Sequence, residues 1–96
     1  MNNLENKNII VTGASGGIGN SIVKKLNQAG ANILASGTRI EKLEELKKNF
    51  ENIKILKFDI SQSDKIGEFI ENATNDLGGS LDGLVNNAGI TQDNLA

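Results

Sequence analysis

The 96-residue chain contains no cysteine, histidine, tyrosine, tryptophan or proline. Without cysteine and histidine it has no disulfide, thiol nucleophile, histidine base or usual zinc site, so we expect no metal centre. Any group that binds or reacts must therefore be a hydroxyl, an amide, a carboxylate, a lysine, an arginine or a backbone group.

Long hydrophobic runs are also absent. The run from Ile9 to Val11 is far shorter than the ~20 residues that span a bilayer, and residues 1–5 lack the layout of a signal peptide. We therefore expect a cytoplasmic protein with no membrane contact. Lysine and arginine, 10 in all, do not outnumber the 12 aspartates and glutamates, so no basic surface is expected to hold nucleic acid.

The composition, with 38% hydrophobic and 23% charged residues, is that of one small globular domain. A chain of this size buries only roughly 60–65% of its unfolded surface, so we expect marginal stability unless something else covers it.

Short β-like runs alternate with stretches of helical spacing, which predicts an α/β fold built from βαβ units around a parallel sheet. We expect a Rossmann-type, doubly wound sheet of four strands and three helices, incomplete, with strand order 3-2-1-4. The predicted strands are Asn8–Thr12, Asn32–Ser36, Ile53–Phe58 and Leu84–Asn87.

Each predicted helix has one apolar face and a residue that ends it. The first turns Ile18, Ile22 and Leu26 inward and ends at Gly30. The second, Ile40–Asn49, and the third, opened by a capping box of Ser61 and Asp64 and ended by Gly78 and Gly79, follow the same pattern. Their inward residues are Leu43, Leu46 and Phe50, and Ile66, Phe69, Ile70, Ala73 and Leu77.

A glycine-rich turn, residues 12–19, follows the first strand and opens the first helix. Gly13 lets the chain turn sharply, Gly17 lets backbone N–H groups approach a diphosphate, and Gly19 lets the helix pack against the strand. The helix N-terminus adds unpaired donors for the anion. An ordinary glycine-rich turn without a ligand is the alternative; a P-loop is disfavoured because no Gly-Lys-Ser/Thr follows.

These residues resemble the short-chain dehydrogenase/reductase family, whose turn reads T-G-x-x-x-G-x-G, as residues 12–19 do. The family's N-N-A-G motif is matched by residues 86–89, and its acid near the adenine by Asp59. The resemblance implies that residues 1–96 are the amino-terminal part of a single NAD(P)-binding Rossmann domain. Gly16 departs from the pattern, because a basic residue often stands there in the reductases described next.

The tail, residues 86–95, looks most like the 3-oxoacyl-acyl-carrier-protein reductases, which commonly read N-N-A-G-I-T-x-D-N-L. That resemblance implies an acyl-carrier-protein-linked substrate and a role in fatty-acid biosynthesis. Another small carbonyl or alcohol substrate, and a non-catalytic nucleotide-binding module, remain as alternatives.

The end of the second strand bears on the choice of cofactor. In dinucleotide folds an acid about 20 residues beyond the glycine turn binds the ribose 2′-hydroxyl of NAD, but here that position is Gly37. A 2′-phosphate has room beside Thr38 and Arg39, with the Ser15 hydroxyl nearby, which favours NADPH. The alternatives are a solvated charge for Arg39 and a helix N-cap for Thr38.

Three further residues also have two interpretations. Asp59 accepts from the adenine amino group or caps the following turn. Asn86 and Asn87 are turn-forming amides, or lie along the cofactor as in the family, where Asn87 is the expected contact. The predicted cofactor-binding set is Gly13, Ala14, Ser15, Gly16, Gly17, Ile18, Gly19, Thr38, Arg39, Asp59, Ile60, Asn87, Ala88 and Gly89.

The family's mechanism uses a tyrosine as proton donor, a lysine that lowers its pKa and a serine that orients the substrate. The chain has no tyrosine, and we expect the matching serine and lysine after residue 96, so no catalytic residue is assigned. The family usually forms homotetramers through elements outside this sequence. We expect an exposed edge on the fourth strand.

Overall fold

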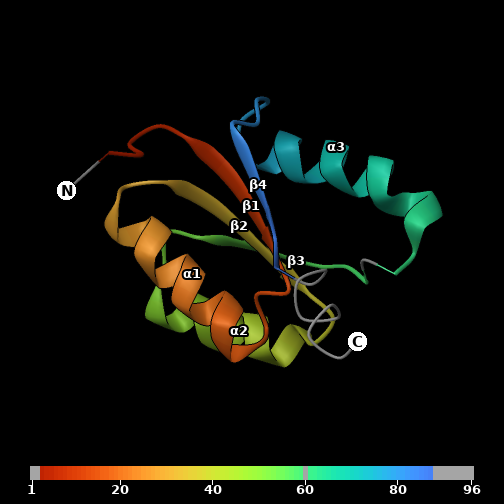
Figure 1. Ribbon diagram of the computed structural model, residues 1–96, viewed down its shortest axis with the longest axis horizontal. Helices are drawn as coiled ribbons and strands as arrows, with labels where there is room; N and C mark the ends of the chain where they lie inside the picture. Colours follow the sequence, from red (N-terminus) through yellow and green to blue (C-terminus); the bar gives the residue numbers. More distant parts are fainter. Residues whose placement is uncertain (1–2, 60, 88–96) are drawn as a thin grey trace.

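The computed structural model describes residues 3–59 and 61–87. It is an α/β fold around one parallel sheet of four strands in the order β3-β2-β1-β4 (Figure 1). The predicted fold class and strand order are confirmed. The elements are β1 (Asn8–Thr12), α1 (Gly17–Gln28), β2 (Asn32–Gly37), α2 (Ile40–Asn49), β3 (Lys54–Lys57), the 3-10 turn η1 (Ser63–Lys65), α3 (Ile66–Asp76) and β4 (Gly83–Asn86).

The helices cover both faces of the sheet, as a doubly wound fold requires. In Figure 1, α1 and α2 lie on one face and α3 lies on the other. Side chains alternate along a strand, so Ile9 and Val11 join the core under α1 and α2, whereas Ile10 joins the core under α3. The buried residues of the first core also include Val23, Ile33, Ala35, Leu43 and Leu46, and those of the second include Leu34, Phe69 and Ala73.

Glycines end α1 and α3, as predicted. Gly30 follows α1 with φ +94°, and Gly78 and Gly79 follow α3 with φ +113° and +103°. Side chains rarely adopt this left-handed conformation, so each helix stops where glycine permits the backbone to reverse. β1 has its predicted bounds. The other strands differ by one residue at their ends: β2 continues to Gly37, β3 is shorter at both ends, and β4 begins at Gly83 and ends at Asn86.

The predicted capping box is wrong. The Ser61 hydroxyl donates to Asp59 Oδ1 at 2.7 Å, and neither η1 nor α3 has a side-chain cap. A carboxylate two residues away is a charged acceptor and bonds the hydroxyl more strongly than a neutral group does. The chain therefore forms η1 first, and α3 begins only at Ile66.

The predicted inward position of Ile18 is also wrong, since its side chain is 55% exposed. The buried residues of α1 are Gly19 and Val23, and Ile22 and Leu26 pack partly against the core. Gly19, Val23 and Leu26 follow the helical repeat. Ile18 lies in the first helical turn, beside the glycine-rich turn.

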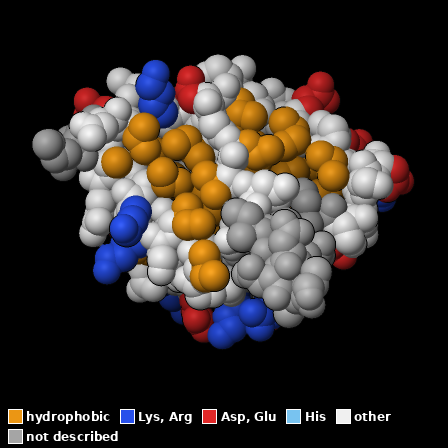
Figure 2. Space-filling model, viewed as in Figure 1, with side chains coloured by type: hydrophobic (Ala, Val, Ile, Leu, Met, Phe, Trp, Pro, Cys, Tyr) orange, Lys and Arg blue, Asp and Glu red, His pale blue; other side chains and the backbone are white. Residues whose placement is uncertain are grey.

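The two edge strands of the described sheet differ in character. β3 exposes Lys54 and Lys57, whereas β4 leaves Leu84 50% exposed. Figure 2 shows hydrophobic side chains gathered on the face that carries β4. Charged edges resist pairing with further backbone and apolar ones invite it, so β4 is the edge more open to another strand. Among the described residues, no helix has the length and apolar character needed to cross a membrane.

Candidate functional site

The four strands are parallel, so the segments that leave their carboxyl ends meet at one edge of the sheet. The glycine-rich turn, residues 13–16, lies there between β1 and α1. Gly13 has φ +65°, a conformation that favours glycine. The next amide, that of Ala14, donates to the carbonyl of Ser36 in β2 at 2.8 Å. The turn is therefore fixed to two neighbouring strands.

Helix α1 packs tightly against this turn. A Cβ on Gly19 would lie 2.6 Å from Ala14 Cα and would clash with the Gly13 carbonyl oxygen as well. These are backbone atoms and cannot move aside without moving the turn. Gly19 thus allows the close packing that we expected, although its contact is with the turn and not with the strand.

Helix α1 begins with amides that have no hydrogen-bond partner in the described part of the chain. Gly16 occupies the N-cap position and has no side chain to cap the helix, so no side-chain cap bond forms. Among residues 3–59 and 61–87, no acceptor is found for the N–H groups of Gly17, Ile18 and Gly19. A Cβ on Gly17 would meet nothing within 4 Å. Packing within the protein gives no reason for glycine there, whereas a diphosphate approaching these amides gives one.

Asparagine side chains hold the carbonyl groups of the turn. Asn20 Nδ2 lies 3.1 Å from the Ala14 oxygen and 3.2 Å from the Gly16 oxygen. Asn87 Nδ2 donates to the Gly13 oxygen at 3.1 Å. These bonds give the carbonyls of Gly13, Ala14 and Gly16 side-chain donors. Asn20 was missed from the sequence; an amide side chain just after the last glycine, four residues beyond Gly16, is the signal that points to it.

The end of β2 carries no carboxylate. Gly37 is buried, and Thr38 and Arg39 after it are exposed. Arg39, the chain's sole arginine, occupies the N-cap position of α2, where no side-chain cap bond forms. The alternative of Thr38 as the helix N-cap is therefore wrong. A positive charge and a hydroxyl stand at this edge beside the glycine-rich turn.

Asp59 caps the turn that follows β3. Its Oδ1 accepts from the Ser61 hydroxyl at 2.7 Å and from the Ser61 amide at 3.0 Å. These hydrogen bonds, the hydroxyl first, hold the pKa of Asp59 below the ordinary aspartate value. The turn-cap interpretation is confirmed, and the contact with adenine stays a prediction.

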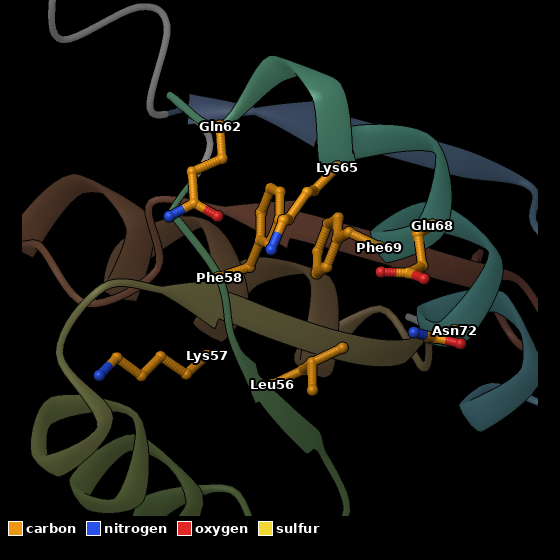
Figure 3. A pocket seen from close by; sticks show the side chains of 8 residues that line it. All are labelled: Leu56, Lys57, Phe58, Gln62, Lys65, Glu68, Phe69 and Asn72. Carbon is orange, nitrogen blue, oxygen red and sulfur yellow. The ribbon is translucent and has the colours of Figure 1, made fainter.

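Phe58 anchors Asp59 to the α3 layer. Its ring stacks on Phe69 of α3, with centroids 4.3 Å apart and planes 8° from parallel. The two rings line a cavity of about 160 Å³ between β3 and α3 (Figure 3). None of the described residues in the predicted cofactor-binding set lines this cavity.

The carboxyl end of β4 is hydrogen-bonded to the end of β1. The Thr12 hydroxyl lies 3.2 Å from the Val85 oxygen and 3.1 Å from Asn86 Oδ1, and Asn87 is 3% exposed. The structure thus brings Asn87 to the glycine turn. Ile60, Ala88 and Gly89 lie outside the described residues.

A doubly wound parallel sheet with open amides in a glycine-rich turn at its carboxyl edge defines a dinucleotide-binding fold. The residues present fit the diphosphate of such a ligand, because within residues 3–59 and 61–87 the N–H groups of Gly17, Ile18 and Gly19 have no acceptor and no atom would meet a Cβ on Gly17.

Comparison with known proteins identifies the family. Residues 7–96 match the model of the short chain dehydrogenase family, and the chain belongs to this family of oxidoreductases, which use nicotinamide nucleotides. A nodulation protein G of Rhizobium sp. (strain N33) is 43% identical over 96 residues, covering 99% of this chain and 39% of that protein. A 3-oxoacyl-[acyl-carrier-protein] reductase of Rickettsia conorii is 38% identical, covering 100% of this chain and 38% of that protein.

Solved structures agree with the fold. A short-chain dehydrogenase/reductase from Brucella melitensis superposes with a TM-score of 0.75 at 29% identity over 85% of this chain and 35% of that one. One from Mycobacterium smegmatis reaches a TM-score of 0.80 at 22% identity over 88% of this chain and 37% of that one, which supports the fold alone. The chain spans 37% to 39% of the length of the first curated relatives it matches.

Proposed function

We propose that residues 1–96 are the nucleotide-binding part of an NADPH-dependent reductase that acts on 3-oxoacyl groups of acyl carrier protein. The preference for NADPH depends on one observation. Gly37 ends β2 without a carboxylate, and the exposed Thr38 and Arg39 follow it directly. An acid at this point would bind a ribose 2′-hydroxyl and repel a 2′-phosphate.

Each part of the nucleotide has a matching set of residues. The free amides at the start of α1 receive the diphosphate, supported by the partial positive charge of the helix N-terminus. Ser15, Thr38 and Arg39 receive the 2′-phosphate. Asp59 lies near the adenine, and the Asn87 side chain stabilises the turn by donating to the Gly13 carbonyl.

The chemistry of the bound nucleotide is hydride transfer from its nicotinamide ring. Residues 1–96 bind and orient that nucleotide, and having no tyrosine they lack the family's proton donor. Reduction is therefore a property of the protein that also supplies the donor, and residues 1–96 alone are inactive.

The substrate assignment depends on the resemblance of residues 86–95 to the 3-oxoacyl-acyl-carrier-protein reductases and on the Rickettsia conorii relative. A second candidate keeps the fold and cofactor with a different carbonyl substrate. Relatives that are named for other substrates favour this second candidate. One of them is an NADPH-dependent 1-acyldihydroxyacetone phosphate reductase of Schizosaccharomyces pombe, which is 36% identical over 84 residues.

The cofactor proposal is tested by titrating the purified chain with NADPH and NADH and following calorimetric heat. One or two hydrogen bonds to the 2′-phosphate predict roughly ten- to hundred-fold tighter binding of NADPH. Arg39→Ala is expected to remove about tenfold of that preference. Lys48→Ala, at the other end of α2, is the matched control and leaves it unchanged. Equal affinities for both nucleotides in the unaltered chain would contradict the proposal.

The substrate proposal needs the protein that also contains the family's tyrosine. We expect it to oxidise NADPH with acetoacetyl-acyl carrier protein faster than with a dihydroxyacetone phosphate ester, and residues 1–96 alone to show no oxidation with an acetoacetyl thioester. The opposite order of rates would favour the second candidate.

A further inference from the structure

The cavity between β3 and α3 has no part in the proposed nucleotide site. Its apolar lining comes from two elements that are distant in the sequence. Phe69 of α3 is 4% exposed, and Leu56 and Phe58 from the end of β3 are half-buried. The rings of Phe58 and Phe69 lie parallel to each other, and aromatic rings attract further rings in offset-stacked or edge-to-face contacts. This part of the lining therefore suits a flat apolar group.

The volume of the cavity limits that group to a single ring. An apolar cavity of about 150 Å³ holds one benzene molecule, and the cavity here measures about 160 Å³. Drug-sized ligands occupy pockets of roughly 300–1,000 Å³. A six-membered ring thus fits, and a much larger ligand does not.

The rim of the cavity is polar. The exposed side chains of Gln62, Lys65, Glu68 and Asn72 form it, and none of them makes a hydrogen bond or ion pair within the described part of the chain. In Figure 3, Gln62 and Lys65 lie at the Phe58 end of the cavity, and Glu68 and Asn72 lie at the other end. An ammonium and an amide N–H can both donate to an anion. The Phe58 end therefore suits an anionic substituent, whereas the carboxylate of Glu68 repels one from the opposite end.

A larger hollow over α2, of about 380 Å³, lacks these features. Four charged residues line it, with Ile55 as the sole apolar one. The Lys47 ammonium there already donates to the Ile53 oxygen at 2.6 Å and lies 3.3 Å from the Glu51 oxygen. This hollow thus offers neither a flat apolar surface nor an uncommitted cation at position 47.

We propose that the cavity between β3 and α3 is a second binding site, which takes a small molecule made of one six-membered aromatic ring with a carboxylate. The ring contacts Leu56, Phe58 and Phe69. The carboxylate accepts from the Lys65 ammonium and the Gln62 amide, in charge-assisted hydrogen bonds. The proposal does not depend on the choice of nucleotide or substrate at the carboxyl edge of the sheet.

Benzoate is the test ligand, added to the expressed protein that contains residues 1–96 while backbone amide shifts are followed by NMR. For a ligand of this size we expect a dissociation constant on the order of 1 mM. The largest shifts should occur in residues 56–58 and 62–72. Cyclohexanecarboxylate has the same charge without a flat ring and should bind roughly three- to tenfold more weakly. Benzylamine, with the opposite charge, should also bind more weakly than benzoate.

Two substitutions separate the ring from the charge. Lys65→Ala is expected to weaken benzoate roughly two- to fivefold, because an exposed ion pair is lost, and to leave the neutral benzamide unchanged. Phe58→Leu is expected to weaken both ligands roughly three- to tenfold, because the ring contact is lost. Lys42→Ala, an exposed lysine of α2 outside the cavity, is the matched control and should change neither.

The proposal is overturned if benzoate causes no saturable shifts in these residues, or if benzylamine binds as tightly as benzoate. Displacement of benzoate by NADPH would also overturn it, because the two ligands would then share one site. If Phe58→Leu is not recovered folded, the comparison of benzoate with cyclohexanecarboxylate tests the ring contact in the unaltered protein. An absence of preference between NADPH and NADH would contradict the proposed function alone.

Discussion

The polar groups at the two ends of the sheet differ in how fully they are hydrogen-bonded. At the amino end, the buried Asn8 side chain pairs in full: its Nδ2 lies 2.9 Å from the Ser80 oxygen and 3.2 Å from Ser80 Oγ, and its Oδ1 accepts from Asn32 at 3.0 Å. Its backbone exchanges two 2.8 Å bonds with Asp82. This network joins β1 to the neighbouring β2 and to the segment that enters β4.

At the carboxyl end the pairing is one-sided. The carbonyls of the glycine-rich turn are held by Asn20 and Asn87, whereas three amides at the start of α1 have no acceptor among the described residues. Unpaired donors reduce stability when they are desolvated. The amino end is therefore fully paired, whereas the carboxyl end keeps three donors at the place where we propose that the diphosphate binds.

The largest effect is expected from Gly19→Ala at the carboxyl end. The added Cβ collides with the backbone of Gly13 and Ala14, which should lower the free energy of unfolding by about 3 kcal/mol and abolish nucleotide binding. Denaturant unfolding measures the first effect and calorimetry the second. Gly67→Ala on α3, where a Cβ meets nothing within 4 Å, should instead stabilise by about 0.5–1 kcal/mol. Equal effects of the two substitutions would refute the packing argument.

The second effect is at the amino end. Asn8→Ala removes three side-chain contacts and leaves the Asn32 amide without its acceptor, so we expect a loss of about 2 kcal/mol in unfolding free energy. The ratio of NADPH to NADH affinity should not change. Ser80→Ala, which removes only the 3.2 Å contact, is the smaller control. A changed nucleotide ratio in Asn8→Ala would break the separation between the two ends.

A third, smaller change sharpens the contrast. Asn20→Ala frees the carbonyls of Ala14 and Gly16 and should cost about 1 kcal/mol of stability. Because the turn becomes less ordered, both nucleotides should bind roughly tenfold more weakly. Ser21→Ala, which loses one exposed bond to the Gly17 carbonyl, is the control in the next position. Unchanged affinity in Asn20→Ala would show that the turn needs no support from this side chain.

The smallest effect concerns pH. Hydrogen bonds from Ser61 keep the pKa of Asp59 below the ordinary aspartate value. A depressed folded-state pKa means that the stabilisation is present above the unfolded pKa of about 3.9 and is lost as the pH falls through the folded value. Carboxyl carbon shifts in an NMR titration should show this low pKa, and Ser61→Ala should raise it. An Asp59 pKa that is the same in both proteins would contradict the assigned cause.

Most of the fold was predictable because its signals are local. The apolar runs that became β1 and β2, the helical repeat of Leu43 and Leu46, and the glycines after α1 and α3 each act through neighbours in sequence. The strand order follows from the known order of the dinucleotide-binding fold, which the glycine-rich turn indicates. The capping box predicted at Ser61 was wrong, because the Ser61 hydroxyl donates to the nearby Asp59 carboxylate and not to the helix.

The glycine-rich turn was found from sequence, but its supports were not. Asn20 was missed because its acceptors are carbonyls whose direction depends on the folded turn. Asn87 was named as a cofactor contact, and the structure adds that it holds Gly13 across 74 residues of chain.

The sequence by itself determined the class of fold, the family and the position of the nucleotide-binding turn, because glycine freedom and hydrophobic periodicity are properties of single residues and short segments. Only the tertiary structure decided which amides of that turn find no acceptor among the described residues and how closely Gly37 lies to Ser15. Those features arise where β1, β2 and β4 come side by side, and distances between atoms of different strands are set by the packed sheet.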